Sequence, residues 1–286
     1  MKQILSVIIP VRNEEIHLQR CLDSLKGLNC TIYVVDSSSE DRTPQILRDN
    51  NIEFINYDAE TFGEKLNWAI DNLPIKTEWT MRLDADEFPT EKFVKEINPK
   101  LCELAPEVDG VYVNRQFSFM GRCMKHGGMF PKKALRIWRT GRAYSESRLL
   151  DEQMVCMSQT VEYLDLDIVD DNLNSLSMWV AKHNNYSTRE AISNDNDEIQ
   201  ADIFGDQPSR IRWLKSNFYE RTPLFIGPFL YFIYRYFFRF GFLDGREGFV
   251  WHVLHAFWYR FLVDAKKHEI KTSAVKYQHD FKNIYK

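Results

Sequence analysis

Short apolar runs alternate with amphipathic segments over the first hundred residues of the chain. Continuous apolar runs predict buried strands, whereas apolar residues that recur every three or four positions predict helices. Asn13 stands where it can cap the first helix. The alternation predicts an α/β fold, with a mostly parallel sheet and helices on both faces. The expected strands cover residues 4–10, 31–35, 53–55 and 79–83, and the expected helices cover residues 18–28, 43–49 and 63–72.

Polar clusters follow three of the expected strands. They occupy residues 12–14, 36–41 and 84–87. In open parallel sheets, ligands bind at the carboxyl ends of the strands, where successive loops meet. These clusters therefore predict a ligand site at one edge of the sheet.

Asp84 and Asp86 are the strongest candidates for metal chemistry. In extended backbone, residues two apart point to the same side, so both carboxylates would face one point beyond the strand. Carboxylate oxygens suit a hard cation, Mg2+ or Mn2+, that shares its shell with substrate phosphates. The alternative is a solvated acidic turn that caps the helix near Thr90.

Composition narrows the class of protein. The 286 residues are 44% hydrophobic and 27% charged, which is typical of a folded chain and excludes a disordered or collagen-like one. A formal net charge of −4 argues against a general nucleic-acid binder. The five cysteines form no CxxC pair, so we expect neither a zinc knuckle nor a disulfide framework, and a reducing compartment fits best.

The aromatic residues, 14% of the chain, concentrate after residue 209 and are interleaved with arginine. Rings at headgroup depth and guanidinium groups on anionic lipid are typical of helices that lie on a membrane surface. Gly241 and Gly245 divide the segment into two helices, which are too interrupted to span a bilayer. We therefore predict that residues 209–262 contact a membrane. The alternatives are that these helices pack on the preceding α/β domain or pair two chains as a homodimer.

The N-terminus shows no signal peptide, because charged residues from Arg12 onward cut its apolar run short. We therefore expect a cytoplasmic protein that is peripheral on the inner face of the cell membrane.

Three motifs, which follow one another along the chain, resemble those of a known protein family. Residues 6–15 (SVIIPVRNEE), 34–43 (VVDSSSEDRT) and 83–87 (LDADE) resemble a family-2 glycosyltransferase with the GT-A fold. The likeness covers about residues 1–115, and residues 63–69 resemble the family's helix before the Asp-x-Asp strand. The middle and tail are similar to bacterial transferases that build surface polysaccharide or lipopolysaccharide.

The resemblance implies a nucleotide-sugar donor. By this resemblance Asp84 would lie near the ribose and the metal, and Asp86 would hold the metal that bridges the pyrophosphate. That metal would offset the charge that grows on the departing nucleoside diphosphate. Lys65 would add a positive charge near the phosphates, unless it is a surface lysine. The other implied donor contacts are Pro10, Val11 and Glu14 at the nucleotide, and Asp36 at the base.

The resemblance also implies an acidic general base on a later loop. An inverting transfer needs such a group to take the proton of the acceptor hydroxyl. We choose Glu152, with Asp151 second; the alternative is that both are ordinary loop carboxylates. Gln153 departs from the histidine that relatives often have there. A further metal ligand is expected near residues 170–172, and His183 is a weaker candidate that has a structural role as its alternative.

We therefore predict a GT-A catalytic domain over residues 1–207, with a nucleotide-sugar half (1–115) and an acceptor half (116–207), followed by a membrane-association region over residues 208–286. The predicted activity is metal-dependent, inverting transfer of a sugar to a lipid-linked or lipopolysaccharide acceptor. The rival interpretations are a nucleotidyltransferase and a non-catalytic membrane scaffold.

Overall fold

The computed structural model describes residues 3–146, 153–158, 160–192 and 222–272. The chain divides into two compact units. Unit 1 comprises residues 1–125 and 129–174, and unit 2 comprises residues 126–128 and 175–286. The predicted boundary at residue 207 lies outside the described residues. Helix α5 (Leu176–Ile192), which the sequence analysis assigned to the catalytic domain, belongs to unit 2.

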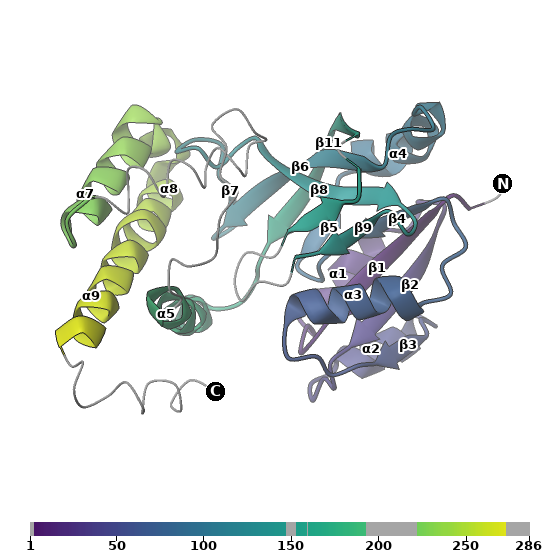
Figure 1. Ribbon diagram of the computed structural model, residues 1–286, viewed down its shortest axis with the longest axis horizontal. Coiled ribbons are helices and arrows are strands. Elements are labelled where there is room, and N and C mark those ends of the chain that lie inside the picture. The colour runs from purple at the N-terminus through teal and green to yellow at the C-terminus, as the bar shows by residue number, and fades with distance from the viewer. Residues whose placement is uncertain (1–2, 147–152, 159, 193–221, 273–286) are drawn as a thin grey trace. The chain divides into compact units, whose positions relative to one another are not determined.

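Over its described residues, unit 1 is built on a nine-stranded sheet (Figure 1). Its main path runs β3-β2-β1-β4-β8-β6-β11-β5, and β7 pairs with β6. The strands are β1 (Leu5–Val11), β2 (Cys30–Asp36), β3 (Phe54–Asn56), β4 (Trp79–Arg82), β5 (Glu87–Pro89), β6 (Gly110–Phe119), β7 (Arg122–Cys123), β8 (Lys132–Arg139) and β11 (Val161–Asp171). A separate pair is formed by β9 (Ala143–Ser145) and β10 (Met154–Cys156).

The direction of the strands changes half-way across this sheet. β1, β2, β3 and β4 are mutually parallel. β8 runs antiparallel to both β4 and β6, β11 is parallel to β6, and β5 is antiparallel to β11. The predicted α/β fold is confirmed, and its parallel part is the N-terminal half of the sheet.

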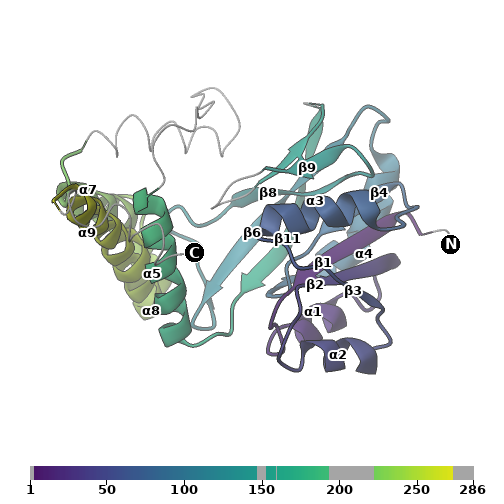
Figure 2. The ribbon, with the colours of Figure 1, turned by 60° about the horizontal axis from the view of Figure 1, so that its bottom comes forward.

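Helices cover both faces of the parallel half. They are α1 (Leu18–Ser24), α2 (Thr43–Asp49), α3 (Phe62–Asn72) and α4 (Glu91–Glu103). Val7 and Ile9 of β1 share one apolar core with α1, α2 and α4, whereas Ile8 shares the opposite core with α3. This explains why β1 is apolar at nearly every position, as strands buried on both faces are. Figure 2 shows α3 lying across the sheet.

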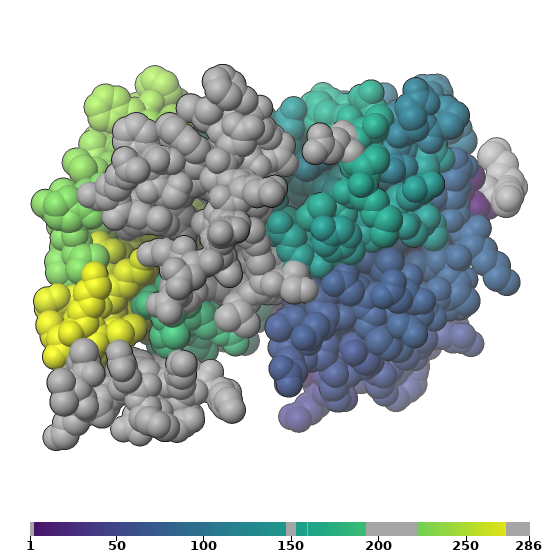
Figure 3. All heavy atoms as spheres, in the orientation of Figure 1, coloured from purple at the N-terminus to yellow at the C-terminus, as the bar shows by residue number. Residues whose placement is uncertain are grey.

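Helix starts in unit 1 follow the local sequence only in part. Thr61 caps α3 in a reciprocal pair with Glu64, as a Thr-x-x-Glu sequence favours. The prediction that Asn13 caps the first helix is wrong, because its Oδ1 accepts the backbone N–H of Glu40 instead. Asn13 thereby links the loops that follow β1 and β2, and α1 begins later, at Leu18. In the space-filling view the blue residues and the teal residues of unit 1 lie against each other on the face that is shown (Figure 3).

Unit 2 is helical over its described residues. Beyond α5 it contains α7 (Ile226–Ile233), the π-helical η2 (Tyr234–Phe238), the short 3-10 turn η3 (Gly241–Asp244), α8 (Gly245–Trp251), the π-helical η4 (His252–Trp258) and α9 (Tyr259–Thr272). The break predicted at Gly241 and Gly245 is confirmed, since η3 lies between the two helical arms. A Cβ at Gly241 would lie 2.4 Å from Nε2 of His252, so a larger residue cannot fit there. Of the described helices, none is both long and apolar enough to cross a bilayer.

Candidate active site

The acidic turn begins where β4 ends, at the carboxyl edge of the parallel strands. The N–H of Glu87 donates to the carbonyl of Asp84 (2.9 Å), so the chain turns here and does not remain extended. The expectation that Asp84 and Asp86 face one point through extended backbone is therefore wrong. Nor does the acidic turn cap α4, because the hydroxyl of Thr90 accepts the N–H of Phe93 there.

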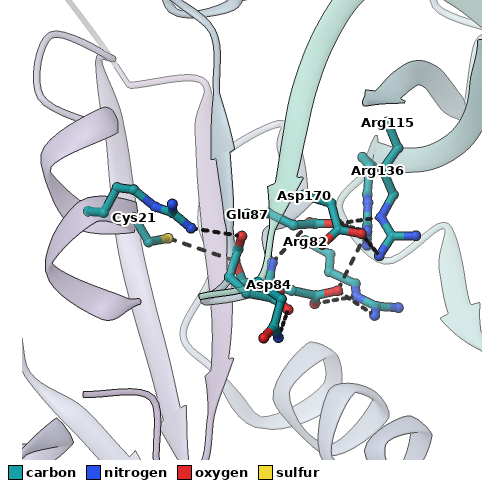
Figure 4. Close-up of polar contacts among 10 residues, drawn as sticks. Cys21, Arg82, Asp84, Glu87, Arg115, Arg136 and Asp170 are labelled. Carbon is teal, nitrogen blue, oxygen red and sulfur yellow. Dashed lines mark hydrogen bonds and ion pairs between the residues drawn. The ribbon is translucent and has the colours of Figure 1, made fainter. Parts of the chain in front are cut away.

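Asp84 is held by arginine. Its two oxygens accept Nε and Nη2 of Arg82 at 2.8 and 2.9 Å, and Nη2 of Arg136 lies 3.5 Å from Oδ2 (Figure 4). Burial alone raises the pKa of Asp84, but Arg82 and Arg136 lower it by more, so its pKa lies well below the usual range. Asp84 is thus a permanent anion whose charge is matched inside the protein.

Asp86 has a different environment. Its Oδ2 accepts the side-chain amide of Asn172 at 3.0 Å, and its carbonyl accepts the N–H of Asp171 at 3.1 Å. The side chain is partly exposed. Within the described part of the chain, Oδ1 of Asp86 makes no hydrogen bond. Asp86 therefore offers one carboxylate oxygen while Asn172 holds the other.

A buried ionic network lies behind the turn. Glu87 is fully buried and accepts Nε of Arg115 at 2.8 Å and Nη2 of Arg136. Arg115, on β6, also donates to Asp170 of the neighbouring strand β11, 2.6 Å away (Figure 4). Burial is the main cause that raises the pKa of Asp170; the charge of Arg115 opposes it and the charge of Asp86 adds to it. The network fixes the position of the turn, since buried charges are tolerated only when they are paired.

Helix α1 holds the chain that follows β11. Nη1 of Arg20 lies 2.6 Å from Oδ2 of Asp171, and its Nη2 donates to the carbonyl of the same residue. Asn172, which follows directly, is the donor to Asp86. The segment in which we expected a further metal ligand therefore does reach Asp86, and its contact is an amide.

The loops after β1 and β2 form the other part of this edge. Both oxygens of Asp36 accept from Ser39, whose hydroxyl in turn accepts the N–H of Asn13 at 2.8 Å. Glu14 donates its N–H to Thr43 and accepts Nδ1 of His17 at 2.6 Å. Asp36 and Glu14 are thus oriented by short-range contacts before any ligand binds.

Lys65 is buried and is not a surface lysine. Its Nζ donates to the carbonyl of Val11 at 3.1 Å. Burial lowers the pKa of Lys65, while the nearby Asp36 and Glu14 act in the opposite direction. Pro10 and Val11 are buried in β1. The structure therefore brings Val11 and Lys65 together at the end of β1, with Asp36 and Glu14 near the Lys65 charge.

The sequence profile described as "Glycosyl transferase family 2" matches residues 6–161, more than half of the chain. The chain belongs to this family. This confirms the resemblance found in the sequence, and the enzyme class predicted with it: the protein is a glycosyltransferase. The nucleotidyltransferase interpretation does not agree with the match.

Individual relatives are more distant. Lipopolysaccharide core biosynthesis glycosyltransferase LpsC of Rhizobium meliloti is 25% identical over 276 residues, which cover 93% of this chain and 94% of that protein. TarS of S. aureus (residues 1–349), solved with UDP-GlcNAc, is 16% identical with a TM-score of 0.47, covering 98% of this chain and 93% of that one. The mannosyltransferase PcManGT of Pyrobaculum calidifontis is 12% identical with a TM-score of 0.46, covering 99% and 79%. The family assignment rests on the sequence profile.

Two of the predicted site residues of this family-2 transferase, Asp151 and Glu152, lie outside the described residues. His183 lies in α5 of unit 2. Its ring stacks on Trp179 at 3.6 Å between centroids, and its Nδ1 lies 2.8 Å from the carbonyl of Trp179. Burial lowers the pKa of His183. These contacts are those of a packed aromatic side chain, and a ligand role for His183 stays a prediction.

The sequence analysis missed the arginines. Arg82, Arg115 and Arg136 match the charge of the acidic turn, and none of them was singled out. The signal was present for two of them, because Arg82 and Arg136 stand beside apolar residues in their strands. Arg115 lies between Asn114 and Gln116 and gives no such signal. A charge inside a buried strand needs a partner of opposite sign, and the carboxylates of the motif were the available partners.

Proposed function

We propose that the protein is a metal-dependent, inverting glycosyltransferase that moves a sugar from a nucleotide sugar to a lipid-linked or lipopolysaccharide acceptor. The observation that carries the proposal is the partly exposed carboxylate of Asp86. It ends the family motif, its Oδ2 is held by Asn172, and it lies at the carboxyl edge of the sheet, where α/β folds bind ligands.

The residues at this edge fit a divalent cation. Mg2+ and Mn2+ take few protein ligands when they bind with a substrate's phosphates, and one or two carboxylates suffice. Asp86 would be the carboxylate ligand, and Asn172 would orient it. Among the described residues no cluster of three or more His, Cys, Asp or Glu side chains forms a closed metal cage. When bound, the cation supplies positive charge to the departing diphosphate.

The charge balance of the turn supports one principal ligand. Asp84 is paired with Arg82 and Arg136, so its negative charge is already matched. Among the described residues Asp86 forms no ion pair, so it is the carboxylate that remains for the metal. We propose that the main role of Asp84 is to orient the turn. Its contribution to binding the ribose and the metal is secondary.

We propose Asp36 and Glu14 as acceptors for hydrogen bonds from the nucleoside. Pro10 and Val11 would form the wall of the pocket, and Lys65 would add a positive charge beneath it. Glu152, or Asp151 in its place, would take the proton of the acceptor hydroxyl as that oxygen attacks the anomeric carbon. This assignment rests on the family resemblance, because the loop lies outside the described residues.

The acceptor class is supported by the relative LpsC. Its name concerns lipopolysaccharide core biosynthesis, and the alignment covers nearly the whole of both chains. A likeness that extends beyond the donor motifs includes the parts of the chain that would bind the acceptor. We therefore propose an acceptor saccharide that is carried by a lipid.

A helical segment of unit 2 supports a membrane location, because it exposes apolar side chains and buries a charged one. We call this segment, residues 226–238, the inverted helix. The segment from Ile226 to Phe238 buries Arg235, whose Nε donates to the carbonyl of Gly127 at 2.6 Å. Its exposed positions recur at helical spacing and are all apolar or aromatic: Ile226, Phe229, Leu230, Ile233, Tyr234, Phe237 and Phe238. A helix in water shows the opposite pattern. Part of α7 is visible in green at the surface of unit 2 (Figure 3).

The surface of this helix fits an anionic bilayer. η3 adds the exposed Phe242 and Leu243, and between residues 222 and 243 there is no acidic residue. Arg239 is exposed within the patch. Arg235, which we expected on lipid, is instead buried. We propose that residues 208–286 form a membrane-association region on the cytoplasmic face, which brings the transferase to a lipid-linked acceptor; a second copy of this chain is the competing occupant.

Product analysis tests the proposed activity. The full chain is incubated with UDP-, GDP- and dTDP-sugars, Mn2+ and a lipid-linked saccharide extract. A transferase releases nucleoside diphosphate, whereas a nucleotidyltransferase releases or consumes pyrophosphate. Inversion is read from the anomeric configuration of the product. Donor binding without transfer would favour the scaffold interpretation, and equal transfer in the presence of excess chelator would contradict metal dependence.

A further inference from the structure

His17 occupies an unusual place at the start of α1. The side chain is fully buried, and its neighbours along the helix stripe are the apolar Leu18 and Cys21. An apolar residue would pack there without the cost of burying two ring nitrogens. Both nitrogens are nevertheless used. Nδ1 lies 2.6 Å from Oε2 of Glu14, and Nε2 accepts the backbone N–H of Leu173 at 2.9 Å.

The contact with Leu173 determines which nitrogen carries the proton. A peptide N–H can only donate, so Nε2 must be the unprotonated nitrogen. The proton of the neutral ring is then on Nδ1, and it is donated to the carboxylate of Glu14. His17 therefore has one tautomer, and each of its two hydrogen bonds supports the other.

The two partners of His17 belong to different parts of the candidate site. Glu14 lies in the loop after β1, among the predicted nucleotide contacts, and within the described residues its Oε1 accepts no hydrogen bond. Leu173 directly follows Asn172, whose amide holds Asp86. One turn further along α1, Arg20 binds Asp171. The segment that carries Asn172 is thus attached to α1 on both sides, by Arg20 before it and by His17 after it.

We propose that His17 is a positioning residue of the transferase: as its Nδ1–H tautomer it orients Glu14 toward the nucleoside and, through Leu173, keeps Asn172 on Asp86. The inference rests on the proposed function for the identity of the two ligands. One buried imidazole would thus position both a residue of the nucleoside pocket and the residue that holds the metal ligand.

The two halves of this role are separable by substitution. The amide nitrogen of asparagine reaches the place of Nδ1, so His17→Asn keeps the bond to Glu14 and loses the one to Leu173. The amide oxygen of glutamine reaches the place of Nε2, so His17→Gln keeps the bond to Leu173 and loses the one to Glu14. His17→Leu loses both. Leu22→Ala is the matched control, because Leu22 is buried in the same helix and its apolar side chain cannot hydrogen-bond to Glu14 or Leu173.

The experiment measures, for the nucleotide sugar that the donor panel selects, the KM and the Mn2+ concentration that gives half-maximal rate. We expect His17→Gln to raise the donor KM about fivefold to tenfold and to leave the Mn2+ requirement unchanged. We expect His17→Asn to do the reverse and His17→Leu to raise both. Leu22→Ala should lower Tm with neither change. If all three His17 variants behave like Leu22→Ala, His17 only packs, and the proposal is overturned.

A second readout does not depend on activity. In the full chain labelled with 15N-histidine, the ring signals of His17, assigned by their loss in His17→Leu, should show a protonated Nδ1 and an unprotonated Nε2. A proton on Nε2 would overturn the proposal whatever the enzyme transfers. Failure of the proposed function would give a different result: the wild-type chain would neither bind a nucleotide sugar nor respond to Mn2+.

Discussion

Nδ2 of Asn172 lies 3.0 Å from Oδ2 of Asp86, although 86 residues separate the two along the chain. The contact exists because β5 and β11 pair in antiparallel register, with Asp170 opposite Glu87. A donor that holds one oxygen of a ligating carboxylate fixes where the other oxygen points. Asn172 is therefore the residue that gives Asp86 its orientation.

Replacing Asn172 should weaken metal use more than it weakens folding. We expect Asn172→Ala to raise the Mn2+ concentration for half-maximal activity about tenfold, the usual effect of losing a group that orients a metal ligand. The titration of activity with Mn2+ measures this. Asn72→Ala is a matched control on the exposed face of α3. An unchanged Mn2+ requirement in Asn172→Ala would show that Asp86 does not need this contact.

Removal of the Asp86 carboxylate should abolish transfer. We expect Asp86→Asn to lower the rate at least about a hundredfold, because the amide keeps the shape of the side chain but not the charge that holds a cation. The rate of nucleoside diphosphate release measures the loss, and circular dichroism checks the fold. Asp71→Asn, an exposed change on α3, should have wild-type activity. Full activity of Asp86→Asn with saturating Mn2+ would refute the metal assignment.

The arginine beneath the turn should matter for stability. Arg136 is buried and is paired with the fully buried Glu87. Arg136→Met leaves that carboxylate without one of its two cations, and we expect a loss of about 3 kcal/mol in the free energy of unfolding. Lys95→Met breaks the exposed pair with Glu91 and should cost less than about 1 kcal/mol. Urea unfolding of both variants makes the comparison, and equal losses would contradict it.

Unit 2 should lose stability in mild acid through His252. This histidine is fully buried, and neither ring nitrogen has a hydrogen-bond partner among the described residues. Burial, with Arg235 acting in the same direction and Asp244 opposing it, lowers the pKa of His252 to about 4. Above pH 6.5 the group is neutral in both the folded and the unfolded chain. As the pH falls from 6.5 toward 4, the unfolded chain binds the proton first, so stability falls.

The expected size of this effect is about 2 kcal/mol between pH 8 and pH 5. His252→Met should remove that part of the pH dependence while leaving stability at pH 8 unchanged or higher, since an unpaired buried polar group is lost. Thermal unfolding of both chains at the two pH values measures it. If the wild type and His252→Met lose the same stability on acidification, His252 is not the cause.

The inverted helix predicts which residues enter a membrane. Phe238 is 70% exposed and Phe237 is 54% exposed. We expect the double change Phe237→Ser and Phe238→Ser to reduce flotation with phosphatidylethanolamine–phosphatidylglycerol vesicles about tenfold or more, because two buried rings are lost from the bilayer. Tyr144→Ser, an exposed aromatic of unit 1, is the control.

A charge change in the same patch distinguishes lipid from a second copy of the chain. Arg239→Glu should weaken binding to vesicles with anionic lipid more than to neutral ones, because basic residues near such a surface contribute about 1 kcal/mol each. If the double Phe variant floats as well as the wild type but changes from dimer to monomer in solution, the apolar face pairs two chains.

The parallel half of the fold could be predicted from the sequence because its signals are local. β1 is apolar at consecutive positions and α1 has a single stripe, so each pattern indicated its element before any packing was known. The reversal of direction at β8 has no such local signal. It depends on pairing between strands that are distant in the chain. An antiparallel strand that is buried on both faces has the same continuous apolar pattern as a parallel strand.

The sequence by itself determined the family, the α/β class and the two carboxylates of the motif, because each depends on residue types at short spacing. Only the tertiary structure decided that Asp84 is neutralised by Arg82 and Arg136, whereas Asp86 is held by Asn172 and keeps an oxygen available. It also decided that Arg235 is buried while Phe238 is exposed. Both outcomes follow from the low polarity of a protein interior, where a charge must find a partner and where the nearest partner is set by strand register and helix packing, not by distance along the chain.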